Sequence, residues 1–187
     1  MDNGAEKLEH AEPIAKVRKW LAEVVIGHNL CPFARSEFTA GRVRYRVLAG
    51  RKSKSVIAAL LDELVFLDEH HEVETTLLIL ADGWRDFYDY LGLLDTAQQA
   101  LENADYEGVY QLASFHPDYV FADEAVDDAS NYTNRSPLPL LHLLRESSLE
   151  RAIASDPSVD QIPERNKQLA RAKGASFWRA LLANIDS

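Results

Sequence analysis

The sequence predicts an α/β fold: a small three-stranded, at least partly parallel sheet with N-terminal and C-terminal helices packed on it. Three segments have the length and residue types of strands, at 42–48, 75–81 and 109–115. Helical patterns long enough to cross over separate them, and this alternation favours parallel pairing.

The first helix is expected to begin at Pro13, because proline is favoured at the first helical position and apolar residues then recur with a 3.6-residue period. It should end near Asn29, since Pro32 disfavours helical geometry at Cys31. Residues 1–12 are polar and are expected to be flexible, and residues 13–187 are expected to form a single domain.

Residues 42–48 alternate polar and apolar side chains, which predicts a strand. Three arginines share one face of it, as in charged edge strands that resist pairing with other chains. An amphipathic helix follows, from about Val56 to His70–His71.

Residues 75–81 form a continuous apolar run that predicts a strand covered on both faces. Asp82 and Gly83 close it, a helix rich in aromatic residues is expected over 85–103, and the third strand over 109–115. After a polar loop, Ser136 and Pro139 mark a fourth helix reaching Ala154. One or two helices then cover 163–184, with a break at Gly174.

Composition and charge limit the classes of function. The 187 residues are 47% hydrophobic and 27% charged, with a net charge of −10. Residues 55–128 hold one Arg against 18 acids, whereas residues 1–54 and 129–187 are mildly basic. A nucleic-acid-binding domain would show a basic excess, so none is expected. No apolar run has membrane-spanning length, and no signal peptide is recognisable, so we expect a cytoplasmic protein without membrane contact.

The segment 114–146 concentrates polar side chains of several types on a long irregular loop, which is typical of a functional site. His116 follows the third strand, at the edge where open α/β sheets bind ligands. It is a candidate general acid/base, and the alternative is a histidine that holds the loop in shape.

Asn131, Asn134 and Arg135 precede the expected fourth helix. Two amides, a guanidinium and the free N–H groups of a helix start would suit a phosphate or carboxylate. Alternatively, Asn134 or Ser136 caps the helix and Arg135 pairs with Asp127 or Asp128.

Within that helix, His142, Arg145 and Glu146 would share one stripe among buried leucines. These three side chains would either support the polar loop or line a ligand pocket beside it.

Cys31 is the single cysteine and cannot form an internal disulfide, which fits a reducing compartment. It is a possible catalytic nucleophile, although the end of a helix is unfavourable for a thiolate, and packing is the alternative. His116, Asp118 and His142 could form a mixed metal site, but no metal-ligand spacing supports one. Nucleotide-binding and serine-hydrolase motifs are missing from the sequence, so nucleotide-dependent and serine-hydrolase functions have no support. No metal and no organic cofactor is expected.

The chain resembles the bacterial domain-of-unknown-function family 1415. Three stretches carry the resemblance: Leu30–Ala34 (LCPFA), Ser114–Tyr119 (SFHPDY), and the segment from Asn131 to Glu146 (NYTNRSP followed by LHLLRE). The resemblance implies a bacterial cytoplasmic protein and brings no established activity.

The residues themselves favour an enzyme acting on a small anionic metabolite. His116 would assist group transfer or hydrolysis, with Cys31 as a possible nucleophile. The substrate would be bound by Asn131, Asn134, Arg135, His142, Arg145 and Glu146. The alternative is a non-catalytic ligand-binding or protein-interaction module whose polar loop forms an interface. The sequence leaves the oligomeric state open.

Overall fold

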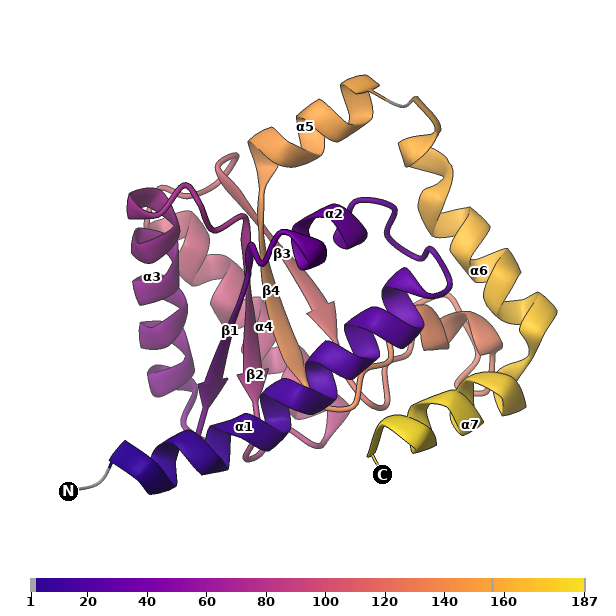
Figure 1. Cartoon of the computed structure of the whole chain (residues 1–187), viewed down its shortest axis with the longest axis horizontal. Coiled ribbons are helices and arrows are strands. Elements are labelled where there is room, and N and C mark those ends of the chain that lie inside the picture. The colour runs from indigo at the N-terminus through magenta and orange to yellow at the C-terminus, as the bar shows by residue number, and fades with distance from the viewer. Residues whose placement is uncertain (1–2, 156, 187) are drawn as a thin grey trace.

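A four-stranded mixed sheet separates two layers of helices in the computed structural model (Figure 1). The structure describes residues 3–155 and 157–186, without the side chains of residues 3–9, 155, 157 and 186. The strands are β1 (Val43–Leu48), β2 (Thr75–Leu80), β3 (Tyr110–Phe115) and β4 (Leu140–Arg145). Their order is β1-β2-β4-β3; β1 and β2 are parallel, and β4 runs antiparallel to both of its neighbours. The predicted α/β class is therefore confirmed, with one strand more than expected.

One face of the sheet is covered by α3 (Ser53–Glu69) and α4 (Phe87–Asn103). The other face is covered by α1 (Asn3–Trp20), by the π-helix η1 (Leu21–Ile26) and by α7 (Ala175–Asp186). In β4, successive leucines enter opposite cores: Leu140 packs with α1 and α7, whereas Leu141 packs with α3 and α4. This alternation follows from the period of two of a strand and buries β4 on both faces.

The remaining helices connect or flank these layers: α2 (Ala34–Thr39), the 3₁₀ turns η2 (Ala129–Thr133) and η3 (Pro157–Gln161), α5 (Glu146–Ser155) and α6 (Ile162–Lys173). In Figure 1, α2 lies in front of the sheet, α5 crosses above its end, and α6 descends beside it. The break expected at Gly174 is confirmed, since this residue has φ 81° and joins α6 to α7.

The fourth helix expected from Ser136 and Pro139 to Ala154 is wrong in its first half. Residues 140–145 form β4, and the helix begins only at Glu146. A leucine-rich segment buried on both faces has neither a helical nor an alternating pattern, so its periodicity does not distinguish a central strand from a buried helix.

The start expected for the first helix is also wrong, because α1 begins at Asn3 and contains Pro13 in its interior. Alanine, glutamate, lysine and leucine are frequent in residues 5–12 and have high helix propensity, which offsets the hydrogen bond lost at one proline. The flexibility expected for residues 1–12 stays a prediction, and residues 1–2 lie outside the described part of the chain.

Candidate functional site

His116 is fully buried and uses both ring nitrogens to hold backbone groups. Its Nδ1 accepts a hydrogen bond from the Asp118 N–H at 3.0 Å, so Nε2 carries the proton and donates it to the Trp84 carbonyl at 2.8 Å. Burial lowers the pKa of His116, and the bond to Trp84 offsets only part of this effect. A neutral imidazole with no vacant nitrogen holds the loop in shape; in this conformation it has no atom left for proton transfer.

Asn131 performs the same kind of work for the loop. Its Oδ1 accepts a hydrogen bond from the Phe121 N–H, and its Nδ2 donates to the carbonyls of Ala125 and Val126. The side chain is fully buried. Asn134 donates to the Ser114 carbonyl and thereby ties the loop to β3. Both amides are occupied by backbone partners.

Arg135 likewise contacts carbonyl groups and, among the described side chains, no carboxylate. Its guanidinium donates to Tyr119 and Val126, each at 3.2 Å, and lies 4.4 Å from the centre of the Tyr132 ring. The Arg135 carbonyl in turn accepts from the Trp20 indole. The predicted ion pair with Asp127 or Asp128 is not among its contacts within the described residues.

The helix start expected beside Arg135 does not exist, so the helix N–H groups expected to bind an anion there are missing. The N–H of Ser136 donates to the carbonyl of His116, and those of Asn134 and Arg135 donate within the η2 turn. These groups therefore have no free donors for a bound anion. His116 and Asn134 do lie side by side, because the His116 N–H donates to the Asn134 carbonyl.

The stripe of His142, Arg145 and Glu146 expected on a fourth helix is also wrong, because residues 140–145 form a strand. The three side chains do not share one face. In β4, His142 faces the α1 side of the sheet, and Arg145 extends toward α3. The Arg145 guanidinium donates to the Tyr110 hydroxyl and to the carbonyls of Leu67 and Val73. Glu146 is the first residue of α5, and its N–H donates to Val109.

A cavity of about 630 Å³ lies between the α1 face of the sheet and the helices η1, α2 and α5. It brings together three of the residues singled out in the sequence: Cys31, His142 and, at the end of β4, Arg145. The floor is formed by strand residues Val43, Thr75, Leu77, Ala113, Phe115, His142 and Leu144. The walls are formed by Trp20, Leu21, Val25, Phe33, Ala34, Leu149 and Ala152.

The cavity begins at the edge of the sheet opposite His116, and its floor extends to Phe115, the last residue of β3. Val43 and Thr75 begin β1 and β2, whereas His116 follows the end of β3, which runs parallel to them. The sequence points to the carboxyl edge of the parallel strands, but the cavity extends from their amino edge along the α1 face of the sheet. It exists there because β4 runs the other way and delivers its last residues to this edge.

His142 is held on the cavity floor by Thr75. The Thr75 hydroxyl donates its single proton to the Leu143 carbonyl, and its oxygen lies 2.7 Å from Nε2 of His142. Nε2 must therefore carry a proton and donate to Thr75. Burial lowers the pKa of His142 to about 4, so the ring is neutral at neutral pH and its Nδ1 has a free lone pair.

Cys31 lies in the wall of the same cavity as a protonated thiol. Burial raises its pKa, and the N–H groups of Phe33 and Ala34, which point at the sulfur, offset only part of that effect. The sequence places Cys31 beyond a helix end, but the structure also places it just before α2, whose first N–H is one of these donors. Across the described residues, no hydrogen bond joins Cys31 to His142, so the two do not form a thiolate–imidazolium pair.

Charged groups gather at the end of the cavity near α2 and α5. Arg42 pairs with Glu37 at 2.7 Å. Arg151 donates to the Ser148 hydroxyl, which itself donates to Glu74. Among the side chains that the structure describes, no carboxylate forms an ion pair directly with Arg151. We call these residues the mouth of the cavity: Glu37, Arg42, Glu74, Ser148 and Arg151.

The wall formed by η1 has an uncommon backbone. Leu21–Ile26 form a π-helix, which places Leu21 and Val25 against the cavity, and the Leu30 N–H closes a wide turn on the Val25 carbonyl at 2.8 Å. Such helices are rare and occur frequently at functional sites. No feature of the sequence distinguishes this segment from an ordinary helix.

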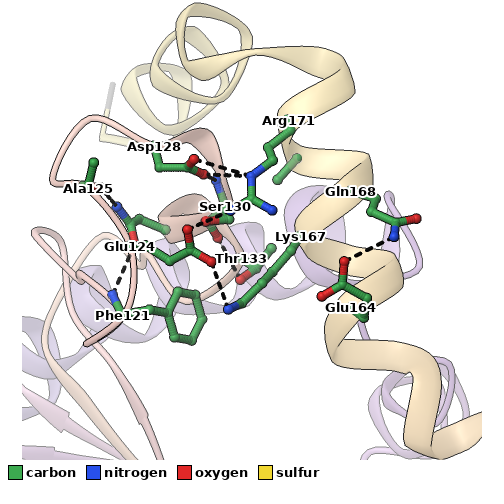
Figure 2. A network of polar contacts seen from close by, with 12 residues as sticks. Phe121, Glu124, Ala125, Asp128, Ser130, Thr133, Glu164, Lys167, Gln168 and Arg171 are labelled. Carbon is green, nitrogen blue, oxygen red and sulfur yellow. Dashed lines mark hydrogen bonds and ion pairs between the residues drawn. The ribbon is translucent and has the colours of Figure 1, made fainter.

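The polar loop is attached to α6 by a network of ion pairs (Figure 2). Glu124 accepts from Lys167 at 2.9 Å and from Arg171 at 2.6 Å, and Arg171 also contacts Asp128. Hydrogen bonds from Ser130 and the Arg171 guanidinium lower the pKa of Asp128 to about 2. The acidic loop and basic α6, distant in sequence, are thus complementary.

Two further findings concern metals and membranes. Among the side chains that the structure describes, no group of three or more His, Cys, Asp and Glu residues could hold a metal ion. Within residues 3–155 and 157–186, no helix combines the length and apolar character needed to cross a bilayer.

Comparison with known proteins identifies the family. Neither curated proteins nor solved structures gave a match to the chain. The model of the family described as "Protein of unknown function (DUF1415)" matches residues 12–180, which is nearly the whole chain. The chain therefore belongs to the DUF1415 family, as its motifs indicated.

Proposed function

We propose that this protein binds a small amphiphilic anion in the cavity. The apolar body of the ligand would lie on the strand residues of the floor, and its carboxylate or phosphate would meet Arg42 and Arg151 at the mouth. The observation that carries the proposal is the cavity itself. Its volume is within the range of small-molecule sites, roughly 300–1,000 Å³, and its few polar groups converge on an otherwise apolar lining.

The mouth carries two arginines and two carboxylates, and it is Arg151 that favours an anionic ligand. Arg42 is balanced by Glu37, but Arg151 reaches Glu74 only through the Ser148 hydroxyl. A ligand carboxylate would supply a direct partner for Arg151 in a fork geometry. This moves the anion-binding role from Arg135, where the sequence suggested it, to the other end of the sheet.

Binding is measured by thermal stabilisation and calorimetry with straight-chain carboxylates from butanoate to decanoate and their matched alcohols. A ligand at about 100 times its Kd adds about 2.7 kcal/mol to the free energy of unfolding. The carboxylates should stabilise the protein, and affinity should rise with chain length until the cavity is filled.

Two cavity variants and one control locate the site. Leu144→Trp fills the floor and should abolish binding, whereas Tyr88→Ser, at an exposed position on α4, should leave binding unchanged. Arg151→Gln should weaken carboxylates about tenfold and alcohols much less. Carboxylate binding that survives Leu144→Trp would refute the proposal.

Catalysis in the same cavity is a second candidate function, because a thiol and an imidazole both face it. His142 would replace His116 as the acid/base, and Cys31 would be the nucleophile only if a ligand lowered its pKa. The test follows a mixture of small metabolites by NMR after addition of wild-type protein or Cys31→Ser. A compound consumed by the first and not by the second would establish a reaction, and none consumed would leave binding as the function. The alternative that the polar loop forms a protein interface stays a prediction.

A further inference from the structure

The cavity floor has one polar atom without a hydrogen-bond partner among the described residues, Nδ1 of His142, and this atom can only accept a hydrogen bond. The Thr75 hydroxyl donates to the Leu143 carbonyl and accepts from Nε2 of His142, which leaves Nδ1 as an acceptor. Within the part of the chain that the structure describes, no donor reaches Nδ1. Because His142 lines the cavity, the natural partner of this atom is a ligand atom.

The surroundings of His142 supply no other polar group for a ligand. Its cross-strand neighbours are Leu77 in β2 and Ala113 in β3, and the Phe115 ring lies 6.2 Å from the imidazole. The proton of Thr75 is already used, so the floor offers an acceptor and no donor. A ligand that covers Nδ1 without donating to it leaves a buried acceptor unpaired, at a cost of about 1–3 kcal/mol, so the ligand group opposite Nδ1 is a strong determinant of affinity.

The two ends of the cavity therefore select different groups. An anionic group is disfavoured on the floor, because it would face the lone pair of Nδ1 among apolar side chains. Arg42 and Arg151 favour the anion at the mouth.

Resting on the proposed function, we propose that the ligand carries an O–H or N–H group at the end remote from its anion, and that this group donates a hydrogen bond to Nδ1 of His142. The ligand class is then a hydroxy or amino derivative of an amphiphilic acid, bound donor-inward and anion-outward. His142 is a specificity-determining residue in this arrangement, and Thr75 positions it by fixing the tautomer.

The first test needs no ligand. Long-range proton–nitrogen NMR distinguishes the two neutral tautomers of a histidine, and the signal of His142 is assigned by its loss in His142→Gln. We expect the Nε2–H tautomer in the wild-type protein at pH 7. An Nδ1–H tautomer or a charged ring would overturn the inference and leave the cavity proposal standing.

The second test compares two probes that differ by the donor alone, ω-hydroxyoctanoate and ω-methoxyoctanoate. In the wild-type protein the hydroxy acid should bind about tenfold more tightly than the ether, as one hydrogen bond to an otherwise unpaired acceptor implies. His142→Gln keeps a polar atom near Thr75 but none at the Nδ1 position, so the two Kd values should become nearly equal. His142→Asn restores an acceptor close to the Nδ1 position and should recover part of the preference.

The outcomes separate the two proposals. Equal affinities in the wild-type protein, or a preference for the hydroxy acid that persists in His142→Gln, would overturn the donor-inward assignment alone. Binding of neither probe, or binding that survives Leu144→Trp, would overturn the proposed cavity function and this inference with it.

Discussion

Acidification should destabilise the protein through His142, and the size of the effect follows from its burial. Burial lowers the pKa of this imidazole from 6.5 to about 4, so between these values the unfolded chain binds a proton that the folded chain does not. The contribution of His142 to the free energy of unfolding is therefore present above about pH 6.5 and is lost as the pH falls toward 4. From about pH 7.5 to about pH 5, linkage gives a loss of about 2 kcal/mol in the free energy of unfolding from this residue alone.

Urea denaturation of wild-type protein and His142→Gln at both pH values isolates this contribution. His116 and His28 also have lowered pKa values, and their effect is present in both proteins, so it cancels in the difference between them. The wild-type protein should lose about 2 kcal/mol more than the variant on acidification. A difference below about 0.5 kcal/mol would show that burial does not hold His142 neutral, and the neutral Nε2–H tautomer would then be wrong as well.

Three further outcomes test the scaffold and the cavity. Glu63 is buried and accepts hydrogen bonds from Arg44, Arg46 and Thr76. Glu63→Gln should therefore lower the free energy of unfolding, measured by urea titration, by about 3 kcal/mol. Asp62→Asn, at an exposed residue, is the control and should change it by less than about 0.5 kcal/mol. Asn131→Ala removes the three bonds that fix the polar loop and should cost about 2–4 kcal/mol, seen as faster amide exchange over residues 117–136. At pH 7, Cys31 should react with a disulfide reagent at least about tenfold more slowly in the native than in the unfolded protein, because burial raises the pKa of the thiol. Octanoate bound in the cavity should slow this reaction further.

Local sequence patterns were sufficient for most of the fold. The helix at Ser53–Glu69 and the strand at Thr75–Leu80 have clear periodicity or composition and appear where expected. The segment 140–145 was missed, because a central strand buried on both faces has no pattern of its own. Its assignment depends on which strands lie beside it, and that is a property of the tertiary structure.

The candidate site shows the same limit more strongly. Cys31 and His142 were singled out by residue type, but their common cavity depends on the direction of β4, which local patterns do not encode. The polar loop is predicted to be a functional site because it carries His116, Asn131 and Arg135. In the structure, these side chains instead form hydrogen bonds with backbone groups. A long irregular segment must satisfy its own N–H and C=O groups, and polar residues placed for that purpose resemble a ligand site in sequence. The mouth residue Arg151 was missed because a single arginine on an amphipathic helix has no distinguishing feature.

The position of β4 has a consequence for how the chain folds. The strand lies between β2 and β3, although it follows both of them in the sequence. During synthesis, the sheet therefore cannot form completely until residue 145 has emerged. Until then, β2 and β3 lack the strand that pairs with both of them. The polar loop is the connection that returns the chain from β3 to this gap, so its internal bonds shorten the search for the correct register. Pairings this distant in sequence slow folding, and Asn131 and Arg135 should therefore influence the rate at which the protein folds as well as its final stability.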